Sequence, residues 1–253
     1  MSEFLSPSVI EAAQAHARAE YPKESCGLVV GGVYQPCFNY ATAPEQDFEI
    51  ASRVYKDALD TGALQAVLHS HPGGPFYPSE RDMQSQIDMD LPWGIIVTDG
   101  ERTSPPIVWG DSLPIAPVIG REFTHGIHDC YSLVRDTFRL GKERLSEQGI
   151  EDWPFDPIEL PEVARSDGWW SGDQDLYADH FAKFGFTPVP LSEVRPGDCF
   201  LMGIRSEKLN HAGILLSNDL LLHHLPTRLS RREPVGIWAR HAEIWVRYEG
   251  QNA

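Results

Sequence analysis

Two histidines and an aspartate in the first half of the chain have the spacing of a metal site. His69 and His71 end an apolar run, and Asp82 follows eleven residues after His71. In a strand, residues i and i+2 face the same side, so both imidazoles can converge on one ion. Residues 73–78 are rich in glycine and proline, so they can fold a helix that begins near Ser79 back toward the strand. Two ring nitrogens and one carboxylate oxygen around an open fourth position are the ligand pattern of catalytic zinc.

A base and a hydrogen-bond donor for this chemistry lie in the same half. A water bound to zinc has its pKa lowered to about 7 and becomes a nucleophile when a base takes its proton. Glu24, at the start of the apolar segment ESCGLVV, can serve as that base. Ser79 can donate a hydrogen bond to an oxyanion that develops on the substrate. The two histidines alone are a weak signal, because strand ends often carry polar residues.

The full string HSHPGGPFYPSERD, read as H-x-H-P-x6-S-x-x-D with Glu24 upstream, resembles the JAMM (MPN-plus) family of zinc peptidases over roughly residues 5–112. The resemblance implies that His69, His71 and Asp82 bind Zn²⁺. It also implies that Glu24 is the general acid/base and that Ser79 stabilises the tetrahedral intermediate. The implied reaction is hydrolysis of a peptide or isopeptide bond. A degenerate copy of this fold that is only a scaffold is the alternative.

The second half carries a cysteine and histidines suited to nucleophilic catalysis. If Asp129 caps a helix, Cys130 lies in its first turn, where the helix dipole favours a thiolate. His211 begins an apolar strand, and His223 and His224 follow across a predicted hairpin turn. A thiol, an imidazole base and an orienting polar group form a generalised triad. The other cysteines lie in or beside apolar strands and are predicted to be small buried hydrophobes: Cys26, Cys37 and Cys199.

Several segments of this half, GREFTHGIHDCYSLVRD, VRPGDCFLM, NHAGILL and LLLHH, resemble the NlpC-type family of papain-like cysteine peptidases over roughly residues 118–250. The resemblance implies that Cys130 is the nucleophile, His211 the general base and His223 the third, orienting residue. The spacing of twelve residues selects His223 over His224. Members of the family cut the peptide stems of the bacterial cell wall, so such peptides are the implied substrate.

The sequence departs from this second family in two places. Asp129-Cys130-Tyr131-Ser132 stands where D-C-S-G is usual, and a long insert rich in tryptophan occupies residues 151–172. Both departures bear on how a substrate fits and leave the thiol chemistry intact. Within the insert, Trp169-Trp170 is the best candidate for a contact with a substrate or partner.

The elements that must position these residues differ between the two halves. The first half alternates helix and strand, which predicts a mixed α/β domain, JAMM-like, with helices around a curved sheet. The second half predicts an α+β domain of papain-like NlpC fold, with a helix packed on an antiparallel sheet. The predicted helices cover residues 7–17, 52–61, 79–87, 129–140 and 173–184, and the predicted strands residues 26–30, 64–70, 93–98, 107–109, 198–204, 211–216, 220–224 and 244–248.

A proline-rich segment separates the halves. Pro105, Pro106, Pro114 and Pro117 lie close together in the sequence. Proline fixes φ and lacks an N–H donor, so we expect a last strand followed by a stiff linker. The predicted domains are a JAMM-like zinc metallopeptidase at residues 1–112, a linker at 113–117 and an NlpC-type cysteine peptidase at 118–253.

Composition and charge narrow the range of partners. The 253 residues include 21 Lys and Arg against 37 Asp and Glu, a formal net charge of −16. Binding of nucleic acid or an anionic membrane needs a basic face, so we expect neither. No apolar run approaches the roughly 18 residues of a membrane helix. The first residues lack the pattern of a signal peptide, which predicts synthesis in the cytoplasm.

A JAMM-like domain joined to an NlpC-type domain is similar to the tail tip assembly proteins of lambda-like siphophages, and the strings DCYSLVRD and HHLPTRLSRR carry this likeness. The resemblance implies bacterial peptidoglycan peptides and phage tail tip proteins as partners. It implies the host cytoplasm during assembly, or the virion tail tip, as the location. The implied function is tail assembly or cell-wall penetration by two peptidases. The alternatives are a tail assembly scaffold whose sites are inactive or process a partner protein, and an enzyme that removes ubiquitin-like tags. The wall-peptidase half argues against the last.

Overall fold

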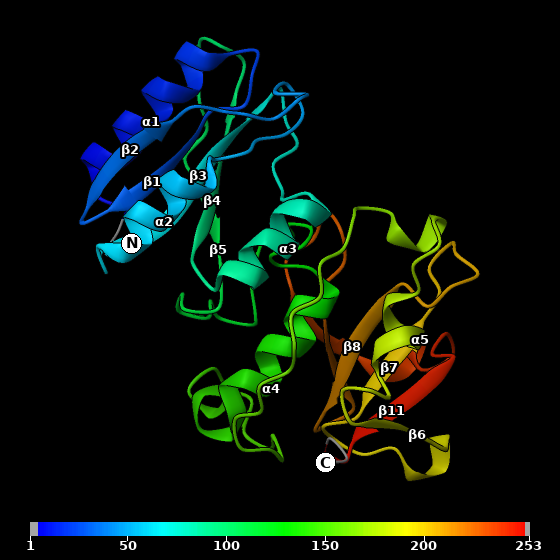
Figure 1. Cartoon of the computed structure of the whole chain (residues 1–253). Helices are drawn as coiled ribbons and strands as arrows, with labels where there is room; N and C mark the ends of the chain where they lie inside the picture. The colour runs from blue at the N-terminus through cyan, green and yellow to red at the C-terminus, as the bar shows by residue number, and fades with distance from the viewer. Residues whose placement is uncertain (1–4, 251–253) are drawn as a thin grey trace. The chain divides into compact units, whose positions relative to one another are not determined.

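The computed structural model describes residues 5–250, which form two compact units divided between Pro114 and Ile115 (Figure 1). Within the described residues, each unit has one main sheet. The sheet of the first unit has five strands in the order β2-β1-β3-β4-β5, and that of the second has six in the order β10-β9-β8-β7-β11-β6. Each unit therefore carries its own core, and each is described by itself.

The sheet of the first unit is mixed. Its elements are α1 (Pro7–Glu20), β1 (Cys26–Val30), β2 (Val33–Cys37), α2 (Ser52–Asp60), β3 (Leu64–Pro72), α3 (Glu80–Met89), β4 (Trp93–Thr98) and β5 (Ile107–Trp109). Strands β3 and β4 pair in parallel, with α3 between them in the chain, and the other pairs are antiparallel. This is the mixed α/β arrangement that the sequence predicts.

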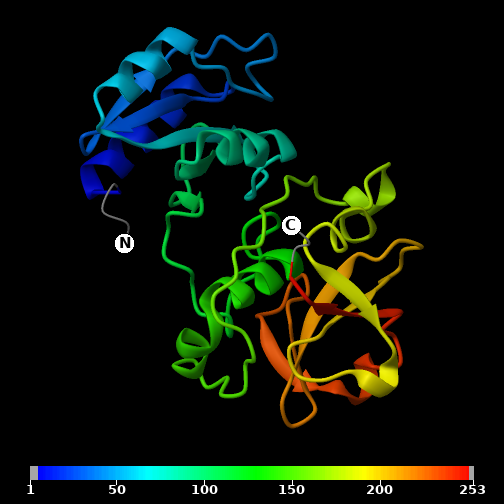
Figure 2. The same ribbon diagram turned by 60° about the horizontal axis from the view of Figure 1, so that its bottom comes forward.

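Helices α1 and α2 lie on opposite faces of this sheet (Figures 1 and 2). Helix α1 begins at the N-cap Ser6, whose Oγ accepts a hydrogen bond from the backbone N–H of Val9. Its buried stripe of Val9, Ala13 and Ala17 packs with Leu68 of β3. Because successive residues of a strand alternate between faces, His69 and its neighbour two positions on face away from α1.

The sheet of the second unit is antiparallel throughout, as predicted for an α+β domain. Its elements are α4 (Cys130–Ser146), a 3₁₀ turn at Trp169–Ser171, α5 (Leu176–His180), β6 (Phe186–Val189), a 3₁₀ turn at Leu191–Glu193, β7 (Cys199–Met202), β8 (His211–Leu216), β9 (Leu220–His223), β10 (Arg231–Pro234), α6 (Val235–Trp238) and β11 (Ile244–Tyr248). Helix α4 packs Leu133, Phe138 and Leu140 into a core with Ala212 and Ile214 of β8.

Two predicted helices differ from the structure. Helix α4 runs beyond Leu140 to Ser146, with a break at Gly141 (φ 65°, ψ 175°). The helix predicted over residues 173–184 is only Leu176–His180, followed by turns. Phe184 and Gly185 close the short helix with hydrogen bonds to His180 and Ala182, and Gly185 has a positive φ that ends helical geometry.

Three strands were missed by sequence analysis, namely β2, β6 and β10, and all three are edge strands. Each contains a proline: Pro36, Pro188 and Pro234. Proline removes a backbone donor and so argues against a central strand, but an edge strand tolerates it because one side has no partner. The proline in each segment therefore argued against a strand, although all three segments form edge strands of the sheets.

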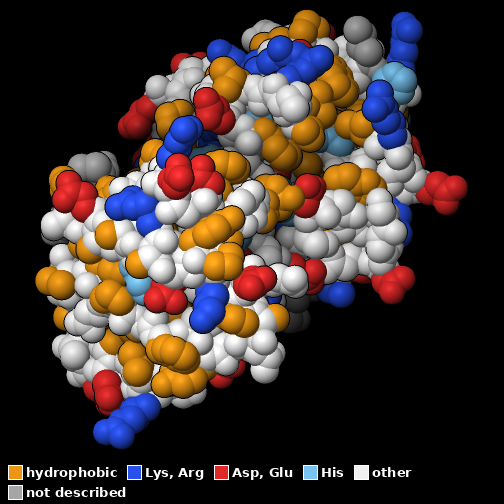
Figure 3. Space-filling view, turned by 90° about the horizontal axis from the view of Figure 1, so that it is seen from above, with side chains coloured by type: hydrophobic (Ala, Val, Ile, Leu, Met, Phe, Trp, Pro, Cys, Tyr) orange, Lys and Arg blue, Asp and Glu red, His pale blue; other side chains and the backbone are white. Residues whose placement is uncertain are grey.

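The surface carries both signs of charge. On the face drawn in Figure 3, Lys and Arg side chains lie in small groups among acidic and apolar ones. This face offers no continuous basic surface. Among the described residues, no helix combines the length and the apolar composition needed to cross a membrane.

Candidate functional site

The structure brings the three predicted metal ligands together in the first unit. Strand β3 presents His69 and His71 on one face, and α3 carries Asp82 at its third position. The potential ligand atoms of the three residues all lie within 4.8 Å of one another. The two Nε2 atoms are 3.1 Å apart, and they lie 3.4 and 3.5 Å from Oδ1 and Oδ2 of Asp82. Two imidazole nitrogens and one carboxylate therefore face a common centre.

The hydrogen bonds around this triad orient it for a cation. The Nδ1 atom of His71 lies 2.9 Å from the carbonyl oxygen of Pro75. A carbonyl only accepts, so Nδ1 carries a proton, and in the neutral ring the lone pair is on Nε2. The ring of His69 stacks on Phe48, with centroids 4.6 Å apart. This donor set is one that zinc prefers.

Burial and charge set the ionisation of the triad. Burial lowers the pKa of His69 and outweighs the neighbouring carboxylate. Burial also acts to lower the pKa of His71, but hydrogen bonds to Asp82 and Pro75 outweigh it and raise this pKa. For Asp82, burial opposes ionisation, yet the two histidines and Ser79 hold the pKa well below its usual range. A carboxylate is thus ready as an anionic ligand.

Glu24 and Ser79 lie at the same site. Glu24 is 6% exposed just before β1, and burial raises its pKa to about 7, with His71 and Asp82 as its main charged neighbours. Ser79 is the N-cap of α3: its hydroxyl donates to Asp82 Oδ2 at 2.7 Å and accepts from the Asp82 backbone N–H at 3.1 Å. Ser79 therefore holds a ligand, and its predicted contact with an oxyanion stays a prediction. A cavity of about 160 Å³ opens beside Asp82 and Trp93.

In the second unit, Cys130 is the first residue of α4. Asp129 caps the helix: its Oδ1 accepts from the backbone N–H of Ser132 at 2.9 Å, and its Oδ2 from that of Gly126 at 2.9 Å. The Sγ atom of Cys130 lies 3.2 Å from the hydroxyl of Tyr177, on α5. Burial and the Asp129 charge raise the pKa of the thiol, although the position at a helix N-terminus alone predicts a lowered one. The resting group is a neutral thiol.

The two predicted histidines form a chain that ends on a carboxylate. His211 Nε2 lies 3.3 Å from His223 Nδ1, and His223 Nε2 lies 3.0 Å from Glu233 Oε2. An ionised carboxylate only accepts, so Nε2 of His223 carries the proton and Nδ1 accepts from Nε2–H of His211. The lone pair of a neutral His211 is then on Nδ1. Burial, with the two neighbouring histidines, lowers the pKa of His211 to about 3, so this ring is neutral near pH 7.

His224 takes no part in this chain. Its Nε2 atom lies 3.2 Å from the carbonyl oxygen of Arg228, and its ring contacts Phe123. The hairpin of β8 and β9 pairs Gly213 with His223, which puts the latter beside His211. The structure therefore places His223, as predicted, and not His224, next to the candidate base.

The thiol and the imidazole are not hydrogen-bonded to each other. Besides Tyr177, Cys130 Sγ contacts the carbonyl oxygen of Asn210, at 3.9 Å, and within residues 5–250 no hydrogen bond joins it to the ring of His211. That ring packs against Phe200 and Trp238 instead. The thiol thus lies against the start of β8, next to the backbone that carries the predicted base.

Sequence analysis missed two residues of this site. Tyr177 lies in the segment predicted as a plain helix, and nothing in its sequence surroundings marks it. Glu233 did leave a signal, because it is the only acidic residue between Asp219 and Glu243. Within the pair Trp169-Trp170, Trp169 is 5% exposed and packs against Tyr177, with ring centroids 5.9 Å apart, so the suggested contact of the pair with a substrate or partner stays a prediction.

Two known families match the chain, one in each of the two units. Residues 6–109 match the family described as "Prokaryotic homologs of the JAB domain", and residues 120–245 match the "NlpC/P60 family". Both are peptidase families. The fold and the two sites therefore define a two-domain protein that joins a JAB-like domain to an NlpC/P60 domain, as the sequence predicts.

Similarity to curated proteins identifies the particular family. "Tail tip assembly protein K" of Escherichia phage N15 is 35% identical over an alignment of 255 positions, which covers 97% of this chain and 96% of that protein. The protein of the same name from Escherichia phage lambda is 35% identical over 189 residues, 74% of this chain and 79% of that protein. The chain belongs to the tail tip assembly protein K family, which confirms the predicted resemblance.

A third relative matches a smaller part of the chain. "Probable TtuB-protein conjugate cleaving protease" of Thermus thermophilus is 30% identical over 111 residues, 39% of this chain and 72% of that protein.

Proposed function

We propose that this tail tip assembly protein has two hydrolytic centres. The first unit is a zinc-dependent peptidase or isopeptidase, and the second is a thiol endopeptidase that cleaves peptidoglycan stem peptides. The protein acts during tail assembly in the host cytoplasm or in cell-wall penetration at the virion tail tip. The observation that carries the proposal is the buried convergence of His69, His71 and Asp82, whose ligand atoms lie within 4.8 Å of one another.

In the first centre, His69, His71 and Asp82 hold Zn²⁺. When bound, the ion supplies a Lewis acid and a water of lowered pKa. Glu24 faces His71 and Asp82 without belonging to the ligand set, so it is free to take a proton from the nucleophile and deliver it to the leaving amine. Support for cleavage of protein conjugates comes from the Thermus thermophilus relative, whose name states that activity.

In the second centre, Cys130 Sγ attacks the peptide carbonyl and its proton passes to Nδ1 of His211. The peptide bond breaks as His211 gives this proton to the leaving amine, and a water then hydrolyses the thioester and restores the thiol. His223 holds the base in the required tautomer through the 3.3 Å contact described above. Hydrogen bonds between a nucleophile and its base are often long before substrate binds. Ala212 packs with α4, whereas the ring of the adjacent His211 packs against Phe200 and Trp238, so we expect this ring to turn toward the thiol in the complex with substrate.

A scaffold function is the second candidate. Burial and the Asp129 charge raise the pKa of Cys130, a state that favours an unreactive thiol. On this alternative, the two domains bind a tail tip partner or process it, and neither acts on the cell wall.

Digestion of purified peptidoglycan, read out by mass spectrometry of released muropeptides, tests the proposal. We expect release by wild-type protein, no release by Cys130→Ala, and normal release by the control Cys37→Ala, whose thiol lies on edge strand β2 of the first unit. A thiol blocker should stop release, and a chelator should not. Absence of release from wild-type protein, with tail assembly unaffected by Cys130→Ala, would establish the scaffold function.

The first centre needs a separate test. We expect purified protein to contain one equivalent of zinc, and we expect His71→Ala to lose it. Cleavage of a ubiquitin-like fusion or of a tail tip protein should disappear on chelation and in Glu24→Ala, which keeps the three ligands. Protein that takes up no zinc after reconstitution would refute a metal centre here.

A further inference from the structure

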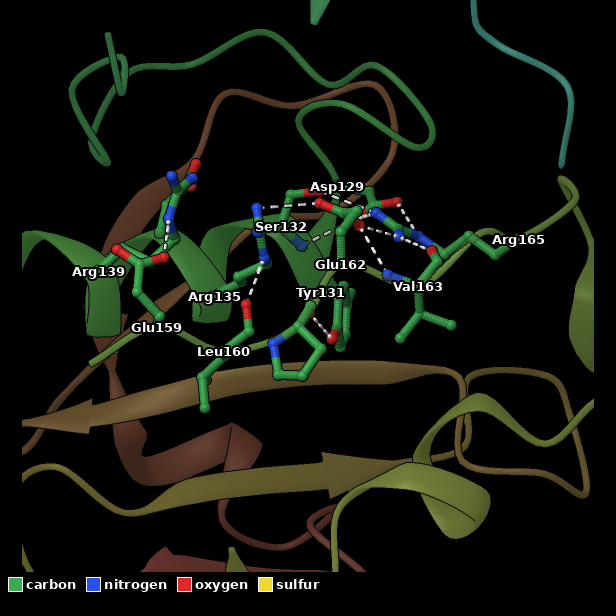
Figure 4. Close-up of polar contacts among 12 residues, drawn as sticks. Asp129, Tyr131, Ser132, Arg135, Arg139, Glu159, Leu160, Glu162, Val163 and Arg165 are labelled. Carbon is green, nitrogen blue, oxygen red and sulfur yellow. Dashed lines mark hydrogen bonds and ion pairs between the residues drawn. The ribbon is translucent and has the colours of Figure 1, made fainter. Parts of the chain in front are cut away.

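The insert at residues 151–172 contains an arginine that is buried against the start of α4. Arg165 is 1% exposed, and it uses all five of its N–H groups (Figure 4). Its Nε and Nη2 atoms donate to the two carboxylate oxygens of Asp129 at 2.8 and 3.0 Å, and Nη2 also donates to Ser132 Oγ at 2.8 Å. Its Nη1 atom donates to Glu162 Oε1 at 2.8 Å and to the carbonyl oxygen of Val163 at 2.6 Å.

The partner of Arg165 is the residue next to the thiol. Asp129 caps α4 and directly precedes Cys130. Its carboxylate is almost fully buried, which opposes ionisation, yet Arg165 outweighs burial and lowers its pKa well below the usual range. A buried charge that keeps its ionised form needs such a partner. Without Arg165, the carboxylate beside the sulfur would keep the backbone N–H groups of Gly126 and Ser132 and the ring of His125, whose Nδ1 lies 3.9 Å from Oδ2.

We propose that Arg165 is a positioning residue of the thiol centre, which fixes the insert on the first turn of α4 and neutralises Asp129 beside Cys130. The inference rests on the proposed role of Cys130 as nucleophile. It assigns the insert, which departs from the NlpC-type pattern, to the catalytic framework of this domain.

The charges around the sulfur support this assignment. Asp129 adds to burial in raising the pKa of the Cys130 thiol, whereas Arg165 and the hydroxyl of Tyr177 lower it. The start of β8 contributes only backbone groups, those of Asn210 and Ala212. Arg165 is therefore the only cation among the groups that shift this thiol, within the part of the chain that the structure describes.

Other arginines of α4 hold the insert without touching Asp129. Arg135 Nε donates to the carbonyl oxygen of Leu160 at 2.8 Å, and Arg139 Nε binds Glu159 Oε2 at 2.9 Å (Figure 4). Arg139 therefore provides a matched control, because its ion pair joins the insert to a later turn of the helix at whose start Arg165 binds. If Arg165 only fastened the insert to the helix, replacing Arg139 or Arg165 would change the pKa of the Cys130 thiol to a similar extent.

The test is the rate of alkylation of Cys130 by iodoacetamide as a function of pH, followed by mass spectrometry of the Cys130 peptide in the full chain. Arg165→Met should raise the apparent pKa of the thiol and slow alkylation near pH 7 by about tenfold, which corresponds to one pKa unit. Arg139→Met should react like wild type. Arg165→Lys should fall between, because lysine keeps the charge and loses the two-pronged contact.

The double variant Asp129→Asn/Arg165→Met separates charge from folding. It removes both buried charges, and asparagine remains a good N-cap. We expect its thiol pKa to lie at or below that of wild type, because Asp129 raises this pKa more than Arg165 lowers it, and this expectation stands even if Arg165→Met alone fails to fold. An unchanged pKa in Arg165→Met, or a double variant whose thiol pKa is raised, would overturn the inference. Alkylation needs no peptide substrate, so a failure to cleave peptidoglycan would refute the proposed function and leave this result readable.

Discussion

At the scale of single residues, the imidazole chain of the second unit depends on a carboxylate at its end. Glu233 accepts from His223 at 3.0 Å and from the indole N–H of Trp238 at 2.9 Å, and it also pairs with Arg231. These contacts fix which nitrogen of His223 carries its proton. Through His223 they fix the tautomer of His211, the candidate base. Glu233 thus determines, through His223, that Nδ1 of His211 is the nitrogen free to take a proton from the thiol.

Glu233→Gln should disturb this tautomer chain. An amide can donate or accept, so His223 loses its single preferred proton position. We expect kcat for peptidoglycan peptides to fall roughly 100-fold with little change in KM, because general-base catalysis contributes a factor of this order. Nitrogen-15 NMR of His211 should show mixed tautomers in place of one. A single unchanged tautomer in Glu233→Gln would show that Glu233 does not control the base.

His224 predicts a pH dependence of stability. Burial lowers its pKa to about 4 from the ordinary value of 6.5. Between these values the unfolded chain binds a proton that the folded chain excludes, so the free energy of unfolding falls as the pH falls, by up to about 1.4 kcal/mol per pH unit. His224→Gln should flatten this slope in urea unfolding at pH 7 and pH 5. An equally steep slope in the variant would assign the acid sensitivity to other groups.

At the scale of elements, α4 continues past a residue that is not helical. Gly141 has φ 65° and ψ 175°, a conformation that L side chains rarely adopt. A Cβ at this position would also lie 2.5 Å from Pro157 of the insert. The break therefore lets the insert approach the helix, and the backbone of Lys142 donates to the carbonyl oxygen of Phe155 at 2.8 Å.

Gly141→Ala should destabilise the second unit by about 3 kcal/mol, because backbone strain and a clash act together. Gly149→Ala is the matched control: Gly149 also has a positive φ, of 74°, but a Cβ there meets no atom within 4 Å. The control should therefore cost only about 1 kcal/mol. Urea unfolding measures both values, and equal losses in the two variants would mean that the contact with Pro157 is unimportant.

The sequence predicted central elements better than edges and links. Strands β3, β4 and β8 are apolar runs bounded by turns. Most of their apolar residues are buried in the structure, so hydrophobicity along the sequence was a sufficient guide to these strands. Three edge strands, β2, β6 and β10, contain prolines and were missed, whereas the edge strand β5 has none and was predicted; the short α5 was predicted too long. The metal ligands were predictable because all three lie close together in one β–α unit. Arg165 and Tyr177 were not, since each meets its partner only through folding of distant segments: Asp129 and Arg165 are 36 positions apart, and Cys130 and Tyr177 are 47 apart.

At the scale of the whole molecule, each centre is built from one unit. The metal-ligand triad and Glu24 come from residues before Pro114, and the thiol and its histidines come from residues after Ile115. No residue named in either candidate site belongs to the other unit. Zinc binding by the first unit and thiol reactivity in the second are therefore expected to persist when the two units are produced as separate chains.

Division of the chain between Pro114 and Ile115 tests this independence. The piece of residues 1–114 should bind one equivalent of zinc as tightly as the full chain does, within about threefold, because a change of that size is under 1 kcal/mol. The piece of residues 115–253 should alkylate at Cys130 with the pH profile of the full chain. Zinc titration against a competing chelator and the iodoacetamide assay measure the two properties. If both pieces fold, as judged by cooperative unfolding, and either property is lost, then one unit completes the site of the other.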